Sequence, residues 1–137
     1  MPLTLNGTIT FFYYTDIDRA EAFYRDTLGF TKVIDVSFAR VFKAAENIHV
    51  GIVDTKEGYL KTAENKPVML TWFTDDIDAW HRKLVKAGVT MELPPKEVDY
   101  LHMKTMLFKD PEGYTLEILQ WLTKPYGKKL TVKPSAK

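Results

Sequence analysis

The chain has 137 residues, of which 45% are apolar, 19 are basic and 18 are acidic, and none is cysteine. This length suits one domain with its own apolar core, and the ordinary composition excludes a globally disordered chain. The net charge of +1 lacks the excess of positive charge that is typical of nucleic-acid-binding proteins. The absence of cysteine excludes thiol nucleophiles, thiolate metal sites and disulfides.

Several other classes of protein are excluded by what the sequence lacks. No apolar run approaches the roughly 20 residues of a membrane helix, and the first residues, MPLTLNG, have no basic and long apolar regions like those of a signal peptide. Neither Ser37 nor Ser135 lies in a nucleophile elbow, and no glycines have the spacing of a phosphate-binding loop. We therefore expect a cytoplasmic protein whose partners are neither nucleic acids nor membranes.

One pattern occurs twice in the chain, with an offset of 60 residues. Residues 9–18 read ITFFYYTDID, and residues 69–78 read MLTWFTDDID. Each copy is a run of aromatic and β-branched residues, typical of a strand, that ends in acidic residues suited to the start of a helix.

A helix is predicted after each of these strands. The apolar residues recur with helical spacing and are followed by Gly29 in the first copy and by Gly88 in the second, which are typical helix stops. The apolar stripes consist of Ile17, Ala20, Tyr24 and Leu28 in the first copy and of Ile77, Trp80, Leu84 and Ala87 in the second.

Three further strands are predicted in each half of the chain. Their composition, rich in Val, Ile and Phe, places them at 31–36, 38–44 and 48–53 and at 89–93, 101–109 and 114–120. The sequence DPEG at 110–113 has Pro and Gly where a type I turn prefers them, so it predicts a hairpin turn. The chain thus reads βαβββ twice.

This repeat predicts one α+β domain over residues 1–122. Its first module spans 7–54, a polar linker spans 55–66, and the second module spans 67–122. Residues 123–137 carry five lysines and no acidic residue, and they form either a solvated tail or a basic contact arm.

Two local patterns make the repeat more specific. They are TDIDRAEAFYRDTLGF at 15–30 and FKDPEGYTLEI at 108–118. Together with the repeat they resemble the vicinal oxygen chelate superfamily, which includes glyoxalase I, bleomycin-resistance proteins, extradiol dioxygenases and fosfomycin-resistance transferases. The resemblance covers about residues 7–121. It implies paired modules whose curved mixed sheets form half-barrels around a central cleft, with the helices outside.

The resemblance also implies where a divalent metal would be held in the family's enzymes. The ligands are a His near the start of each module's first strand, a Glu or His on a later strand of the first module, and a Glu on the last strand. The first two positions correspond to Ile9 and Met69, which are unsuitable for a hard divalent ion, and the other two correspond to His49 and Glu117. Because catalytic sites normally use three protein ligands, we expect no metal cofactor, with Zn, Ni or Mn as the alternative.

Side-chain alternation predicts the wall of the cleft. The resemblance implies that the metal position, here Ile9, faces the cleft, and alternation along the first strand then places Phe12 and Tyr14 under the helix. Such a wall forms either a pocket for a small organic molecule or a filled core. The predicted ligand-binding residues are Phe11, Tyr13, His49, Met69, Thr71, Phe73, Thr105, Leu107 and Glu117.

Glu117 is the best candidate for a catalytic residue, with three interpretations open. It is a structural carboxylate bonded to a neighbour, a contact for a polar ligand, or a general base or metal ligand. Whether the protein catalyses a reaction depends on which of these three interpretations holds.

The leading functional hypothesis is a metal-independent protein that binds a small molecule and sequesters a flat or aromatic compound. The alternative is a metal-dependent lyase or transferase resembling glyoxalase I or a fosfomycin-resistance transferase, and a third possibility is a module that binds a protein partner. We also expect a homodimer, since many two-module members of the superfamily pair between chains and exposed sheet edges need covering.

Overall fold

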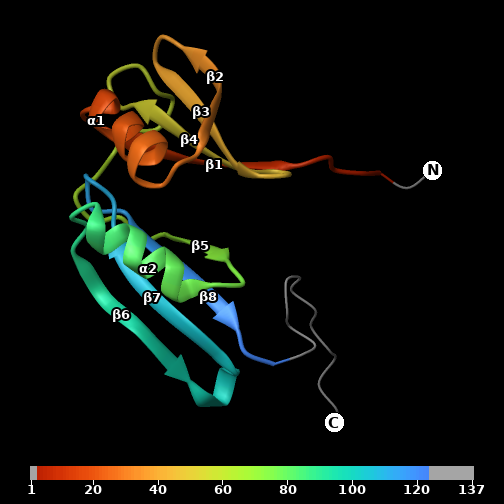
Figure 1. Ribbon diagram of the computed structural model, residues 1–137. Helices are drawn as coiled ribbons and strands as arrows, with labels where there is room; N and C mark the ends of the chain where they lie inside the picture. Colours follow the sequence, from red (N-terminus) through yellow and green to blue (C-terminus); the bar gives the residue numbers. More distant parts are fainter. Residues whose placement is uncertain (1–2, 124–137) are drawn as a thin grey trace. The chain divides into compact units, whose positions relative to one another are not determined.

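The computed structural model describes residues 3–123, so the predicted basic tail beyond Thr123 lies outside the described residues. Two four-stranded mixed sheets are formed, each accompanied by a helix (Figure 1). This confirms the α+β fold built from two βαβββ modules. Within residues 3–123, no helix has the length and apolar character needed to cross a membrane.

The elements of the first module are β1 (Thr8–Tyr14), α1 (Ile17–Ala22), η1 (Phe23–Thr27), β2 (Thr31–Val36), β3 (Ala39–Ala45) and β4 (Ile48–Asp54). Those of the second are β5 (Met69–Phe73), α2 (Ile77–Lys86), β6 (Met91–Val98), η2 (Asp99–Leu101), β7 (Met103–Lys109) and β8 (Thr115–Trp121).

The described residues divide into two compact units, which are treated separately below. The first contains the residues up to Lys66 together with Asp110–Gly113. The second contains Pro67–Lys109 and the residues from Tyr114 onward. The turn predicted at 110–113 therefore belongs to the first unit, although the strands on either side of it belong to the second.

The two sheets have the same topology. Their strand orders are β1-β4-β3-β2 and β5-β8-β7-β6. In each sheet the first strand pairs in parallel with the last strand of its module, and the other neighbours are antiparallel. This equivalence confirms that the sequence repeat is a structural repeat.

Both helical segments have the N-terminal cap and the glycine stop that the sequence predicts. The carboxylate of Asp16 accepts a hydrogen bond from the backbone N–H of Arg19 at 3.1 Å, and that of Asp76 accepts one from Ala79 at 3.0 Å. Gly29 and Gly88 follow the helical segments with φ of 80° and 83°, the left-handed conformation that glycine adopts at little cost.

The first helical segment differs from a continuous α-helix. It is α-helical only as far as Ala22 and continues as a five-residue π-helix, η1. At its end the N–H of Leu28 donates to the carbonyl of Phe23 at 3.0 Å, a spacing of five residues. The predicted apolar stripe is still buried, since Tyr24 and Leu28 are at most 1% exposed.

The prediction of a short strand at 89–93 is wrong in its bounds. The strand β6 runs from Met91 to Val98 and includes Pro94 and Pro95. β6 is an edge strand, so one side of it has no neighbouring strand. A proline whose nitrogen faces that side removes no hydrogen bond from the sheet. The pairing with β7 shifts register between Leu93 and Lys96, as expected where two prolines interrupt the donors.

The core of the first unit lies between its sheet and its helical segment. Phe12 and Tyr14 point to this side and are at most 1% exposed, as predicted. Tyr24 stands at the centre of an aromatic cluster, with ring centroids 5.2 Å from Phe23 and 6.2 Å from Phe42. In the second unit Leu84 of α2 and Leu116 of β8 are both fully buried.

A buried carboxylate joins the DPEG turn to the core of the first unit. Asp110 is 5% exposed, and its Oδ2 accepts hydrogen bonds from the hydroxyls of Tyr14 and Tyr24, the latter at 2.9 Å. Burial, together with the neighbouring Tyr24 and Asp110, raises the pKa of the Tyr14 hydroxyl far above its usual range. Tyr14 therefore keeps its proton and acts as a donor.

The same turn also caps the start of α1. The two carboxylate oxygens of Glu112 accept hydrogen bonds from the backbone N–H groups of Thr15 and Asp16, both at 2.8 Å. The guanidinium of Arg19 donates to the carbonyl of Pro111 at 2.9 Å. Residues about 96 positions apart in the chain are thus bound by side-chain contacts rather than by sheet pairing.

Substituting Asp110 by alanine should lower the free energy of unfolding by about 2–4 kcal/mol, since two buried hydroxyls lose their acceptor. Chemical denaturation followed by circular dichroism measures this change. Asp26→Ala is the control, because Asp26 is exposed and its surface ion pair with Arg25 contributes little to stability. Equal effects of the two substitutions would show that the Asp110 contacts contribute little.

Candidate functional site

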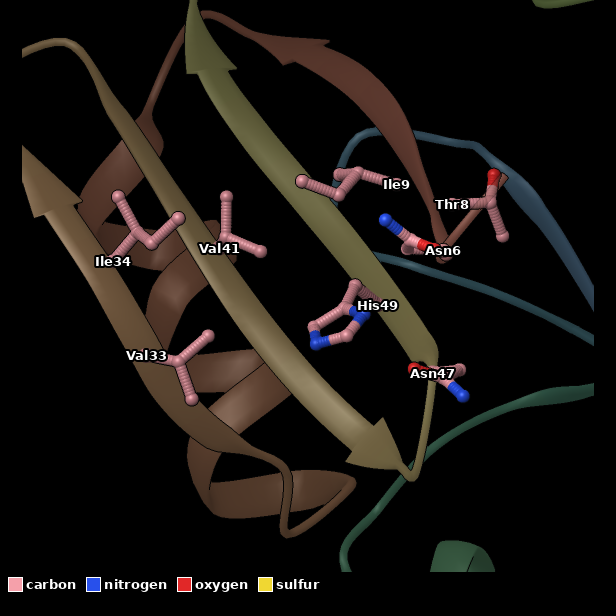
Figure 2. A pocket seen from close by; sticks show the side chains of 9 residues that line it. Asn6, Thr8, Ile9, Val33, Ile34, Val41, Asn47 and His49 are labelled. Atoms are coloured by element: carbon pink, nitrogen blue, oxygen red, sulfur yellow. The ribbon is translucent and has the colours of Figure 1, made fainter. Parts of the chain in front are cut away.

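A pocket of about 460 Å³ lies on the open face of the first sheet, opposite the helical segment (Figure 2). It is lined by Asn6, Gly7, Thr8, Ile9, Val33, Ile34, Val41, Asn47 and His49. None of these lining residues is acidic, lysine or arginine. The volume is within the range of small-molecule sites, which is about 300–1,000 Å³.

One end of the pocket is polar. It contains the amides of Asn6 and Asn47, the hydroxyl of Thr8 and the imidazole of His49 (Figure 2). Asn47 has φ of 59°, a left-handed conformation that asparagine tolerates in the turn between β3 and β4. This conformation places the hydrogen-bonding side chain of Asn47 at the pocket, although the residue lies in a turn and not in a strand.

His49, the second residue of β4, projects toward this pocket (Figure 2). It pairs in register with Ile9 on the neighbouring parallel strand, so both side chains share one face of the sheet. Within residues 3–123 the imidazole makes no hydrogen bond, and its nitrogens can therefore donate to or accept from a ligand. The sequence prediction that His49 faces away from the helix agrees with this position.

The other end of the pocket is apolar. It is formed by Val33 and Ile34 of β2 and Val41 of β3 (Figure 2). The register between β2 and β3 shifts between Lys32 and Ile34, which leaves Val33 as an extra residue in its strand. A bulge of this kind allows two successive side chains to line the same site, against the usual alternation.

Phe11 lies on the same open face but outside the residues that line the pocket. It pairs in register with Gly51 of β4, and a side chain at position 51 would overlap the Phe11 ring. Glycine in a strand interior often marks such a close approach. The ring is 43% exposed and so remains accessible from solvent. Tyr13, two residues along, is half-buried.

In the second unit the predicted polar residues form one cluster. Thr71 of β5 and Thr105 of β7 flank Glu117 of β8, and their hydroxyls donate to its two carboxylate oxygens at 2.7 and 2.5 Å. Glu117 is 9% exposed. Of the three interpretations of Glu117, a carboxylate bonded to its neighbours is the one that the structure shows directly.

The remaining predicted residues of the second unit surround this cluster. Leu107 pairs in register with Glu117 and is half-buried, whereas Met69 and Phe73 are 50% and 41% exposed. Phe73 makes an edge-to-face contact with Trp121, with ring centroids 5.6 Å apart. Sequence reasoning missed Trp121, although its alternation with Glu117 along β8 was a usable signal.

The residues present do not fit a divalent metal site. Ile9 and Met69 stand on β1 and β5 at positions that the resemblance assigns to histidine. Within residues 3–123, no group of three or more His, Asp or Glu side chains is placed to hold a metal ion. Both oxygens of Glu117 already accept hydroxyl hydrogen bonds.

The predicted site residues fall into the two units. Phe11, Tyr13 and His49 belong to the first unit, and the others belong to the second. Of the predicted ligand-binding residues, only His49 lines the pocket on the first sheet. Ile9, predicted to face the cleft, also lines it. The lining residues that sequence reasoning missed are Asn6 and Gly7 before β1, Thr8 of β1, Val33 and Ile34 at the bulge of β2, Val41 of β3 and Asn47 in the turn before β4.

The comparisons with known proteins agree with this architecture. A family model described as the Glyoxalase/Bleomycin resistance protein/Dioxygenase superfamily matches residues 8–118. The comparison with curated proteins finds no match.

Several solved structures share the fold. A glyoxalase/bleomycin resistance protein/dioxygenase from Nocardioides is similar with a TM-score of 0.75 and 18% identity, covering 100% of this chain and 91% of its own. TioX from Micromonospora sp. ML1 has a TM-score of 0.70 and 20% identity, covering 85% of this chain and 98% of its own. A lactoylglutathione lyase from Agrobacterium tumefaciens has a TM-score of 0.69 and 23% identity, covering 87% and 94%. At these identities the likeness concerns the fold alone.

Gly51→Ala should destabilise the protein by about 1–3 kcal/mol, because the new methyl group displaces the Phe11 ring. In a Phe11→Ala background the same substitution should be neutral or slightly stabilising, since Gly51 does not have a left-handed backbone. Chemical denaturation of the four proteins in this cycle measures the coupling. Gly7→Ala is the control, because the nearest atom to its methyl group is 3.8 Å away.

Proposed function

The chain belongs to the Glyoxalase/Bleomycin resistance protein/Dioxygenase superfamily, and we propose that it binds and sequesters a small, uncharged organic molecule without a divalent metal. The proposed site is the pocket on the open face of the first sheet. The molecule has a flat or apolar part and at least one hydrogen-bonding group.

The observation that carries this proposal is the chemistry of the pocket's lining. Its apolar side, at Val33, Ile34 and Val41, faces a group of neutral hydrogen-bonding side chains. A charged ligand would find no opposite charge among the lining residues and would lose its hydration there. A neutral molecule with a polar end avoids that cost and gains from burial of its apolar part.

His49 is proposed as the residue that orients the ligand. Its imidazole belongs to the polar end of the pocket and, when neutral, can both donate and accept one hydrogen bond. A hydroxyl or carbonyl group on a flat ring system could therefore bond to His49 while the ring contacts the aliphatic side chains. This arrangement supports binding and does not by itself supply a reaction.

The absence of a metal is part of the proposal and rests on the donor set. Ile9 and Met69 offer no suitable ligands, and Glu117 is bonded to two threonines. No observation specifically favours the alternative of a metal-dependent lyase or transferase. The homodimer and the cytoplasmic location stay predictions.

A flat neutral probe tests the pocket. We expect 2-naphthol to bind the native protein and Ile34→Glu to weaken its binding by about tenfold or more, since the new carboxylate charges the apolar lining. His49→Phe should weaken 2-naphthol by about fivefold while leaving naphthalene unchanged, because it removes one hydrogen bond. Isothermal titration calorimetry and NMR titration measure these affinities.

Val85→Glu is the matched control for Ile34→Glu. Val85 lies on α2 in the second unit, and its exposed fraction of 53% is close to the 48% of Ile34. The control variant should bind 2-naphthol as the native protein does. Equal binding by all the variants would place the probe elsewhere and would contradict the proposed site.

The purified protein should contain no stoichiometric Zn, Ni, Mn or Fe, because three protein ligands are not assembled within residues 3–123. Elemental analysis by mass spectrometry measures this directly. The melting temperature should also be unchanged by a chelator or by added Zn²⁺. About one metal ion per chain, retained after mild chelation, would contradict this part of the proposal and favour the lyase or transferase.

A further inference from the structure

The second unit contains a buried carboxylate that has no cationic partner. Glu117 is 9% exposed, and within residues 3–123 no lysine, arginine or histidine nitrogen lies within 4.0 Å of it. Its hydrogen-bond partners there are the hydroxyls of Thr71 and Thr105. Buried carboxylates in proteins are usually paired with a cation or bound to a metal.

The two hydrogen bonds suit the charged form of this carboxylate. Each oxygen accepts from one hydroxyl, Oε1 from Thr71 and Oε2 from Thr105. An ionised carboxylate has only acceptor sites and about four lone pairs, so each oxygen retains capacity for a further donor. The threonines thus orient Glu117 but leave its charge without compensation.

The surroundings on the same face of the sheet are apolar and aromatic. Thr71 pairs in register with Glu117, and Phe73 pairs with Leu119, so these side chains share one face. Trp121 continues this face and contacts Phe73. Met69 and Phe73, at 50% and 41% exposure, leave apolar surface accessible beside the carboxylate.

We infer that Glu117 with its two threonines is a binding site for the primary ammonium group of an amine that carries an apolar or aromatic body. An ammonium group has three donors in a compact head. The site offers three acceptor groups, namely the carboxylate and the hydroxyls of Thr71 and Thr105. The aromatic pair of Phe73 and Trp121 can contact the apolar body of such an amine and favours its positive charge.

This site is independent of the pocket proposed above, which lies in the first unit and takes a neutral ligand. A divalent metal is not the occupant, because in the described part of the chain Glu117 belongs to no group of three or more His, Asp or Glu side chains that could hold one. The ammonium ion needs only the one carboxylate.

The experiment compares two probes of nearly the same shape on the full chain at neutral pH. Phenethylamine carries a primary ammonium group, and 2-phenylethanol replaces it by a neutral hydroxyl. We expect the amine to bind at least about tenfold more tightly, the effect of one charge-assisted hydrogen bond. Glu117→Gln should remove this preference, whereas Glu97→Gln, which removes a charge from an exposed position of β6, should keep it.

NMR of the native protein tests the location without a variant. Addition of phenethylamine should shift the backbone amide signals of Thr71, Thr105 and Glu117, and 2-phenylethanol at the same concentration should shift them much less. The melting temperature gives a second readout. Glu117→Gln should not lower it and should raise it by about 2–4 °C, because an uncompensated buried charge is removed.

Three binding results would overturn the inference. They are equal affinity for the two probes, no saturation by the amine up to about 10 mM, and an unchanged amine preference in Glu117→Gln. A lower melting temperature of Glu117→Gln with no amine-specific NMR shifts would likewise make Glu117 a structural residue. Failure of 2-naphthol to bind would contradict only the first-unit pocket, and Ile34→Glu should leave amine binding unchanged.

Discussion

The alternation of side chains across the strands is the constraint on which both units depend. On β1 it sends Phe12 and Tyr14 into the core and leaves Ile9 and Phe11 on the open face. On β8 it buries Leu116 and Ile118 toward the helix side and places Glu117 on the other. One face of each sheet therefore forms a core with a helix, and the other is free to differ in chemistry.

The carboxylate of Asp110 adds a constraint that no strand pairing provides. Its bonds to Tyr14 and Tyr24 join a turn late in the chain to the aromatic core of the first unit. Glu112 and Arg19 extend this contact along the start of α1. Buried polar networks of this kind specify one arrangement of the chain when every member is satisfied.

The two open faces differ in their electrostatics, although they derive from the same repeat. The face of the first unit carries a pocket lined by neutral residues, with His49 as its central polar group. The face of the second unit carries a buried carboxylate between two hydroxyls. Different residues at equivalent positions of a shared fold change binding specificity, while the architecture stays the same.

The sequence by itself determined the features that depend on local periodicity and local backbone chemistry. The caps Asp16 and Asp76 and the stops Gly29 and Gly88 are recognisable because their roles depend only on neighbouring residues. The repeat offset of 60 residues revealed two equivalent modules. Alternation then placed Phe12 and Tyr14 in the core and His49 on the open face.

Only the tertiary structure decided which residues meet across strands and between distant segments. The bulge that brings Val33 and Ile34 to one pocket is a property of the register between β2 and β3, which no single strand encodes. The close approach of Phe11 to Gly51 and the bonds of Glu117 to Thr71 and Thr105 likewise follow from pairing. Asp110 was predictable as part of a turn, but its burial against two tyrosines depends on a contact nearly 100 positions along the chain. Local sequence sets the direction of each side chain, whereas the register of the strands sets its partners.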